Sequence, residues 1–304
     1  MRSTPLRVIG LDIGGSKTQA FAGPVDVGSP HREILAGSAN LSSVGVEESA
    51  RQLTAVFDQL GRDGIAAVCA GAAGVETPEQ AARLHGLIAA QVPAAAIRIV
   101  HDSQLILAAA DVDSGIALIS GTGSVAWGRA ADGTIARAGG WGYLLGDEGG
   151  GYWIGRQAVR HALALADRGE QADLLARQLA DECGVQAPEQ LLDLFYANPE
   201  RKFWAGFSRL VFDCAESGHL AAGGIVAEAA GSLAALVRTV AGRLDITGPI
   251  VLGGGLILNQ PLLRSLLTSN LLDSGHADIR QLRHAPAHGA LTLARRLLTA
   301  PMGS

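Results

Sequence analysis

The sequence predicts an α/β protein with two similar domains, and three features of the chain lead to this fold class. Short apolar segments typical of strands alternate with longer segments whose apolar residues recur at helical spacing. The length of 304 residues suits about two domains, each large enough to bury its own core. An apolar strand that ends in a small-residue turn occurs at residues 8–16 and again at residues 116–124.

The first half of the chain alternates strands and helices, as a partly parallel sheet requires. Its predicted strands are residues 6–14, 19–27, 32–37, 65–70 and 97–100, of which the first three form a meander. Its predicted helices are residues 46–60, a segment that opens at Thr77-Pro78, and a segment headed by Asp102-Ser103. The pattern restarts after residue 112, so we expect domains over residues 1–112 and 113–304.

The second half repeats the opening of the first half and then becomes mainly helical. Strands are predicted at residues 116–120 and 125–129, and a glycine-rich loop follows over residues 139–155. Three or four helical segments then run to about residue 244. A strand at residues 249–252 precedes a helix from about Pro261.

Composition and charge favour a folded protein that binds small molecules. Hydrophobic residues make up 48% of the chain and charged residues 17%, which excludes extended disorder. The net charge is −5, and the only lysines are Lys17 and Lys202, so binding to nucleic acid or to an anionic membrane is disfavoured. No apolar run reaches the about 18 residues of a membrane span, so we expect a cytoplasmic protein.

The cysteines and the paired histidines do not indicate a metal centre. Cys69, Cys183 and Cys214 lack CxxC spacing, so we expect buried free thiols. His284 and His288 have the spacing of two ligands on one helix face, but Pro286 lies between them. We therefore expect both histidines to be structural.

The first motif with chemical potential follows Asp12, at the end of the first predicted strand. The turn Gly14-Gly15-Ser16 and the later Thr18 offer exposed N–H groups and hydroxyls that can wrap a phosphate, while the carboxylate faces its Mg²⁺, usually through water. The alternative is an ordinary hairpin turn in which Asp12 bonds its own backbone. Because Lys17 follows Ser16, the spacing of a Walker A loop is missing.

Two further glycine turns follow predicted strands. Gly121-Thr122-Gly123-Ser124 loosely fits a dinucleotide fingerprint, but a strand rather than a helix comes next, which favours a phosphate clamp between two strands. Gly253-Gly254-Gly255 lies between a strand and a helix, where bare backbone would let a flat ring or a phosphate approach. Together with the first turn, these segments suggest two halves that grip one anion.

Asp102 has two interpretations. It lies between a predicted strand and a predicted helix, where Asp is a frequent N-cap. A strand-end carboxylate between two phosphate turns is also a candidate general base, which accepts the proton of a hydroxyl as its oxygen attacks a γ-phosphate.

The glycine-rich segment over residues 139–151 is a candidate ligand loop. Trp141 can supply a flat apolar wall, and Asp147 can accept hydrogen bonds from a polar ligand. The alternative is that Trp141 and Tyr143 are core anchors and that Glu148 belongs to the start of the next helix.

Taken in order, the segments DIGGSKT, VHDSQ, SGTGS, GGWGYLLGDEGGG and VLGGGL resemble the sugar-kinase/Hsp70/actin superfamily. More narrowly, they resemble the N-acetylglucosamine kinase branch, grouped with the BadF/BadG/BcrA/BcrD-type ATPases. The resemblance spans nearly the whole chain. It implies two ribonuclease-H-like domains of the actin-like ATPase type that flank a central ATP and sugar cleft.

The resemblance also implies roles for individual residues. Asp12 would lie near Mg²⁺, and Asp102 would be the catalytic base and a sugar contact. The implied ATP-binding residues are Gly14, Gly15, Ser16, Thr18, Gly121, Thr122, Gly123, Ser124, Gly253, Gly254 and Gly255, to which the resemblance adds Asn259 and residues 216–218 around the adenosine. The implied sugar-binding residues are Asn40, Asp102, Gly140, Trp141, Gly142 and Asp147.

The implied activity is ATP- and Mg²⁺-dependent phosphorylation of the 6-hydroxyl of N-acetylglucosamine. A glucosamine kinase and an N-acetylmuramic acid kinase remain open, because they differ only in the shape of the sugar pocket. A third option is an ATPase coupled to a protein partner, whose relatives hold an iron–sulfur cluster through cysteines. The three cysteines here do not occupy recognisable positions for that cluster. The oligomeric state stays open, with a homodimer as one option.

Overall fold

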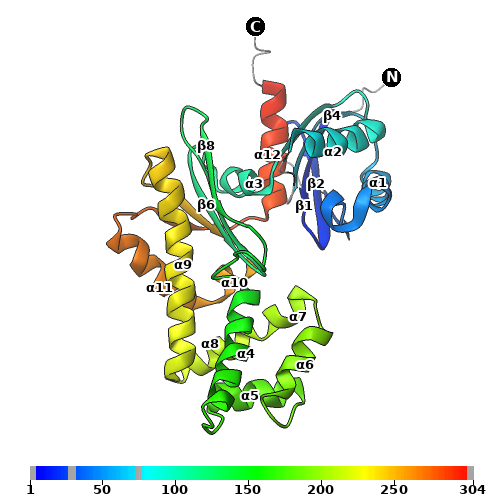
Figure 1. The fold of residues 1–304 in the computed structure, drawn as a ribbon. Helices are drawn as coiled ribbons and strands as arrows, with labels where there is room; N and C mark the ends of the chain where they lie inside the picture. The colour runs from blue at the N-terminus through cyan, green and yellow to red at the C-terminus, as the bar shows by residue number, and fades with distance from the viewer. Residues whose placement is uncertain (1–4, 27–31, 73–74, 76, 300–304) are drawn as a thin grey trace. The chain divides into compact units, whose positions relative to one another are not determined.

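The computed structural model describes residues 5–26, 32–72, 75 and 77–299, and these residues form an α/β protein (Figure 1). The chain divides into two compact units. Unit 1 contains residues 1–113 and 282–304, and unit 2 contains residues 114–281. Each unit has its own five-stranded mixed sheet, which confirms the predicted fold class.

The sheet of unit 1 combines a meander with two parallel strands. Its strands are β1 (Arg7–Ile13), β2 (Lys17–Pro24), β3 (Arg32–Gly37), β4 (Ile65–Ala72) and β5 (Ala96–His101). The order is β3-β2-β1-β4-β5, with antiparallel pairs from β1 to β3 and parallel pairs among β1, β4 and β5. This arrangement brings the carboxyl ends of β1, β4 and β5 to one edge of the sheet.

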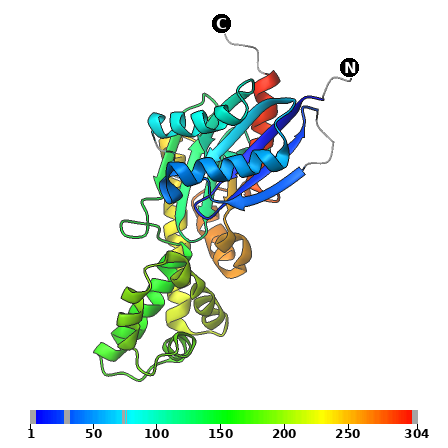
Figure 2. The same ribbon diagram turned by 90° about the vertical axis from the view of Figure 1, so that its right-hand side faces the viewer.

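Helices cover both faces of this sheet, in agreement with the apolar character of its central strands. The helices are α1 (Leu41–Leu60), α2 (Pro78–Gln91), α3 (Asp102–Ala109) and α12 (Pro286–Thr299). Figure 2 shows α1 and α2 in front of the sheet. Ile9 and Leu11 of β1 join the core with α1 and α2, whereas the alternate residue Val8 joins the core with α3 and α12.

Helix α12 belongs to unit 1, although the predicted boundary after residue 112 assigned it to the second domain. Its apolar face packs on β1 and on α3 at backbone contact distance. A Cβ added at Gly10 would lie 2.2 Å from the backbone nitrogen of Leu291, and one at Gly289 would lie 2.0 Å from the carbonyl oxygen of Leu105. These two glycines therefore allow a C-terminal helix to close the core of the N-terminal sheet.

The sheet of unit 2 repeats the topology of unit 1. Its strands are β6 (Gly115–Ser120), β7 (Ser124–Arg129), β8 (Ile135–Gly139), β9 (Ile250–Gly253) and β10 (Ile279–Gln281). The order is β10-β9-β6-β7-β8, with β6, β7 and β8 antiparallel and β9 and β10 parallel to β6. The two turns that look alike in the sequence thus have equivalent places, because each joins the first and second strands of its sheet.

The helices of unit 2 form one large core with its sheet. They are α4 (Gly151–Asp167), α5 (Leu174–Cys183), α6 (Gln190–Ala197), α7 (Arg201–Gly206), α8 (Ser208–Glu216), α9 (Leu220–Leu244), α10 (Gly255–Asn259) and α11 (Pro261–Asp273). Figures 1 and 2 show α4 to α8 gathered beyond one end of the sheet, with α9 running from that group along the sheet. Residues from α4 to α9 are buried together with Ile116 and Leu118 of β6.

Helix α9 is long and apolar enough to cross a membrane by length and composition alone. Its buried residues recur at helical spacing, from Ala222 and Val226 through Leu233 and Val237 to Leu244. They form part of the core with β6, β7 and β8. Packing on the sheet therefore accounts for the apolar composition of α9.

Candidate active site

The turn between β1 and β2 carries the first predicted phosphate motif. The amide of Gly14 donates to the carbonyl oxygen of Lys17 at 3.0 Å, and Gly15 and Ser16 at the tip are exposed. Thr18, in contrast, is fully buried. The tip of the turn therefore presents backbone N–H groups to solvent, as the predicted function requires.

Buried hydroxyls connect this turn to the segment that contains Asn40. The hydroxyl of Ser38 donates to the carbonyl oxygen of Gly14 at 2.8 Å, and Oγ1 of Thr18 accepts from the amide of Ala39 at 2.9 Å. The side chain of Asn40 is itself buried and caps α1 by accepting from the amide of Ser42 at 2.9 Å. Thr18 thus supports the predicted sugar segment through its hydroxyl oxygen.

Asp12 and Asp102 lie at the same edge of the sheet of unit 1. Asp12 of β1 pairs with Gly71 of β4, and the next residue of β4, Ala72, pairs with His101 of β5. Asp102 follows His101 directly. Only the small residues of β4 separate the two acidic positions along the sheet, so their charges interact.

The pKa of Asp12 is raised from 3.8 to about 7, mainly by burial and in part by the negative charge of Asp102, while the charge of Lys17 lowers it. A buried carboxylate close to a second acidic side chain favours a cation nearby, and carboxylate oxygens suit Mg²⁺. Among the residues that the structure describes, no group of three His, Cys, Asp or Glu side chains could hold a metal ion. A Mg²⁺ ion held near Asp12 would therefore have to take its remaining ligands from water and phosphate.

The carboxylate of Asp102 has a buried oxygen that accepts no hydrogen bond. Its Oδ1 lies 2.9 Å from Nδ1 of His101, outside hydrogen-bonding geometry, and is shielded from solvent. His101, rather than Asp102, is the N-cap of α3, because its side chain accepts from the amide of Ser103. The N-cap interpretation of Asp102 is therefore wrong, and its carboxylate is available to another donor.

The second phosphate motif forms a tight turn between β6 and β7. The amide of Gly121 donates to the carbonyl oxygen of Gly123 at 3.0 Å. The third glycine motif lies next to it, since a Cβ added at Gly254, which has a φ of +95°, would lie 2.4 Å from the carbonyl oxygen of Ser120. The turns at residues 121–124 and 253–255 therefore adjoin within unit 2, as two parts of one nucleotide site would.

The glycine-rich loop is fastened to the second phosphate motif by several hydrogen bonds. The hydroxyls of Ser120 and Ser124 donate to carbonyl oxygens of the loop, at 2.9 and 2.7 Å. Where α4 begins, the amides of Gly151 and Tyr152 donate to the carbonyl oxygens of Gly121 and Thr122 at 2.8 and 3.0 Å. The two segments consequently form one packed unit.

Asp147 is the centre of this packed unit. It is buried and has a φ of +65°, a conformation that is uncommon for a residue with a side chain. A Cβ added at Gly123 would lie 2.3 Å from Oδ2 of Asp147, so glycine is required there. Burial raises the pKa of Asp147, while hydrogen bonds from backbone groups of Ser124 and Gly142 and the charge of Arg201 lower it.

Trp141 is exposed, and a buried-core role for it is therefore excluded. Its side chain retains 67% of its accessible surface. The guanidinium of Arg137 lies 5.2 Å from the centre of the Trp141 ring and donates to the carbonyl oxygens of Gly139 and Gly140 at 3.2 and 2.6 Å. Arg137 thus holds the turn that presents Trp141. Sequence reasoning missed it, because the strand that carries it, β8, was not predicted.

The remaining candidate residues from the sequence lie in the following places. Asn259 donates to the carbonyl oxygen of Gly255 at 2.7 Å within α10. Residues 216–218 lie where α8 meets α9, at the other end of α9 from Val240 and Leu244, which pack on β7. His284 precedes α12, so His284 and His288 do not share a helix. The three cysteines are free thiols, as predicted; Cys69 and Cys214 are buried, whereas Cys183 is only partly buried.

Comparisons with solved structures show the same fold in other proteins. A structure from Chromobacterium violaceum, provisionally named as an N-acetylglucosamine kinase, superposes with a TM-score of 0.76 at 24% identity and covers 95% of this chain and 99% of its own. A ROK family glucokinase from Streptomyces griseus, solved with glucose and AMPPNP, has a TM-score of 0.55 at 16% identity, covering 97% and 100%. The fold is that of actin-like sugar kinases.

The sequence itself identifies the family. Residues 9–294 match the BadF/BadG/BcrA/BcrD ATPase family, and the chain belongs to it. An N-acetylmuramic acid/N-acetylglucosamine kinase from Clostridium acetobutylicum is 32% identical over 95% of this chain and 98% of its own length. An N-acetyl-D-glucosamine kinase from Dictyostelium discoideum is 26% identical over 94% and 97%. The expected family and enzyme class, a phosphotransferase, are confirmed.

Replacing Gly123 should disrupt the contact with Asp147. We expect Gly123→Ala to lower the free energy of unfolding by about 1–3 kcal/mol, because the new methyl group would displace a buried carboxylate. Gly231→Ala in α9 is the matched control, since a Cβ there meets nothing within 4 Å and alanine favours the helix. Urea unfolding measures both, and equal stability of the two variants would contradict the account.

The raised pKa of Asp12 predicts a pH-dependent stability. Between pH 4 and pH 7 the folded chain binds the Asp12 proton more tightly than the unfolded chain, so ionisation of Asp12 destabilises the fold as the pH rises. Without divalent cations, the thermal midpoint of Asp12→Asn should equal that of the parent near pH 4 and should be higher than that of the parent at pH 8. A midpoint difference that stays constant across this range would contradict the environment described for Asp12.

Proposed function

We propose that this protein is an ATP-dependent amino-sugar kinase that transfers the γ-phosphoryl group of ATP to the 6-hydroxyl of N-acetylglucosamine. The observation that carries the proposal is the carboxylate of Asp102. It directly follows the parallel strand β5, at the sheet edge that also carries Asp12, and one of its oxygens is buried and accepts no hydrogen bond. The family and the names of the two curated relatives support the same chemistry.

Asp102 is the general base in this proposal. The hydroxyl of the sugar donates its hydrogen to the carboxylate, and its oxygen attacks the γ-phosphorus as the bond to the bridging oxygen of ADP breaks. The proton stays on Asp102 and ADP leaves. A positioned base of this kind contributes about 10²- to 10⁴-fold to the rate.

The glycine turns bind the nucleotide. Backbone N–H groups of Gly14, Gly15 and Ser16 in unit 1, and of residues 121–124 in unit 2, would bind the phosphates, and residues 253–255 would lie against the adenosine. Mg²⁺ near Asp12 would offset the negative charge of the phosphates. Most of the catalysis would then come from positioning and from electrostatic stabilisation.

The sugar contacts come from two segments that the structure holds rigidly. Asn40 is fixed at the start of α1, and Asp147 is fixed on the second phosphate turn. Gly140, Trp141 and Gly142 would provide backbone groups and an aromatic surface for the sugar ring. We place the reaction in the cytoplasm, where ATP is supplied.

Release of ADP from ATP and Mg²⁺, measured with and without sugars, tests the proposed activity. We expect strong stimulation by N-acetylglucosamine and little by glucose, with glucosamine and N-acetylmuramic acid assayed in parallel. ATP hydrolysis that is indifferent to every sugar would contradict the proposal and favour the ATPase coupled to a protein partner. A preference for free glucosamine would show that the proposed substrate is wrong and that the enzyme is a glucosamine kinase.

The role of Asp102 is tested by Asp102→Asn, which keeps the shape of the side chain and removes the base. Turnover should fall by at least about 10²-fold, while the affinity for ATP changes little. Asp111→Asn is the matched control, since Asp111 is an exposed carboxylate of the same unit whose positive φ asparagine tolerates. A variant at Asp102 with near-normal turnover would exclude it as the base.

A further inference from the structure

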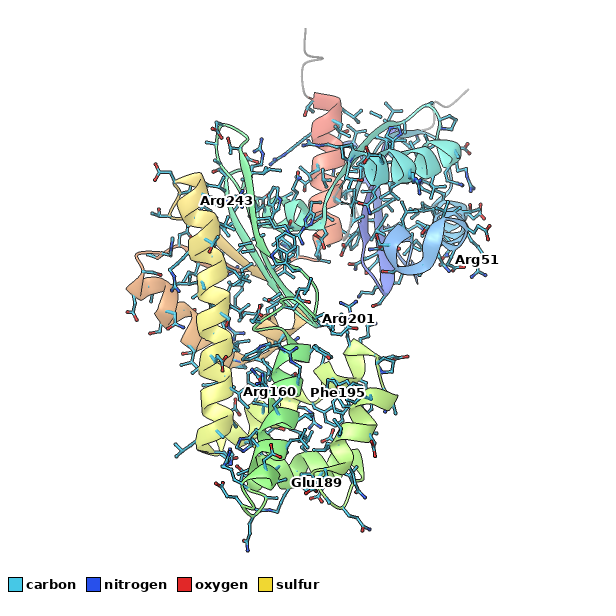
Figure 3. The ribbon with its side chains drawn as sticks, viewed as in Figure 1. Arg51, Arg160, Glu189, Phe195, Arg201 and Arg243 are labelled. Atoms are coloured by element: carbon cyan, nitrogen blue, oxygen red, sulfur yellow. The ribbon has the colours of Figure 1, made fainter. Side chains whose placement is uncertain are left out.

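Beside the loop that carries Asp147, two arginines from different helices approach the same aromatic pair. Arg156 comes from α4 and Arg201 from the start of α7, and the rings are those of Tyr143 in the loop and Tyr152 in α4. Figure 3 shows Arg201 where the helical group approaches the strand ends of unit 2. The proposed reaction does not assign a role to either arginine.

The position of the Arg201 guanidinium is set by its aromatic neighbour. It lies 5.6 Å from the centre of the Tyr143 ring, at the distance of a cation–π contact. Tyr143 in turn meets Tyr152 edge-on, with ring centres 5.0 Å apart. Nη1 of Arg156 lies 3.4 Å from the carbonyl oxygen of Tyr143, so both the ring and the backbone of Tyr143 have neighbours that hold them.

The donors of Arg201 are not used by an acidic side chain. Over the described ranges 5–26, 32–72, 75 and 77–299, no carboxylate lies within 4.0 Å of Arg201, and its side chain is exposed. Arg209, one helix further along, differs in this respect, because it pairs with Glu182 at 3.3 Å and with Asp213 at 3.7 Å. Arg201 therefore presents a planar set of N–H donors without an anionic partner.

Arg201 is also close enough to Asp147 for its charge to lower the pKa of that carboxyl. Asp147 is the residue that we propose to hold a sugar hydroxyl. Tyr143, against whose ring the guanidinium of Arg201 lies, directly follows Gly142, which we also assign to the sugar. On this assignment, a substituent of the sugar would lie near Arg201. Guanidinium and carboxylate groups match in geometry and pair through two parallel hydrogen bonds, so an anionic substituent would be recognised there.

We propose that Arg201, supported by Tyr143 and Arg156, is the specificity residue that recognises a carboxylate on the acceptor sugar. This inference rests on the proposed amino-sugar kinase activity and specifies its substrate class. N-acetylmuramic acid has the required chemistry, since it is N-acetylglucosamine with a lactyl ether on O3 and leaves the 6-hydroxyl free. N-acetylglucosamine is neutral and has no anionic group that Arg201 could bind.

The test compares kcat/KM for N-acetylmuramic acid and for N-acetylglucosamine in the parent, Arg201→Gln, Arg201→Lys and Arg209→Gln. In Arg201→Gln, kcat/KM should fall about tenfold for the acidic sugar, because KM rises, and less than about threefold for the neutral sugar. Arg201→Lys should recover part of the loss, because it restores the charge without the planar fork. Arg209→Gln, which removes an exposed arginine with its own acidic partners, should leave both values unchanged.

The other outcomes separate this inference from the proposed function. Equal losses on both sugars, or a raised KM for ATP, would overturn the assignment of Arg201 and indicate a structural or nucleotide-binding role. A parent enzyme that phosphorylates N-acetylglucosamine but not N-acetylmuramic acid would overturn the inference and leave the kinase activity in place. A parent enzyme that phosphorylates neither sugar would overturn the proposed function itself.

Discussion

The site in unit 2 depends on one buried contact, the carboxylate of Asp147 against the bare backbone of Gly123. A buried carboxylate is stable only if donors surround it, and backbone groups of Ser124 and Gly142 supply hydrogen bonds to it. The contact fastens the glycine-rich loop to the turn at residues 121–124. Residues that we assign to the sugar and residues that we assign to the phosphates are therefore held by one rigid element, as precise positioning of two substrates requires.

In unit 1, side-chain hydroxyls connect the corresponding segments. Ser38 and Thr18 tie the segment before α1 to the turn after β1, while the parallel register brings Asp12 and Asp102 to one edge. Both units thus place a small-residue turn after the first strand of a five-stranded sheet of the same order.

Much of this arrangement was predictable, because strands that end in small-residue turns leave a local pattern in the sequence. The local pattern was too weak to predict β8 and β10, which are short, or α12, which begins at Pro286 after an irregular segment. Six helices, α4 to α9, occupy the stretch for which three or four were expected, because α6, α7 and α8 are short and follow one another closely. The contacts of Asp147 with Gly123 and of Arg201 with Tyr143 join residues that only the folded chain brings together, so no local pattern could have shown them.

The most direct test of the central claim is to identify the phosphorylated product by ³¹P NMR after incubation with ATP, Mg²⁺ and N-acetylglucosamine. The account predicts a phosphomonoester signal coupled to the protons on carbon 6 of the sugar, formed in step with ADP. A signal from inorganic phosphate alone, or a phosphate attached at another sugar carbon, would contradict it.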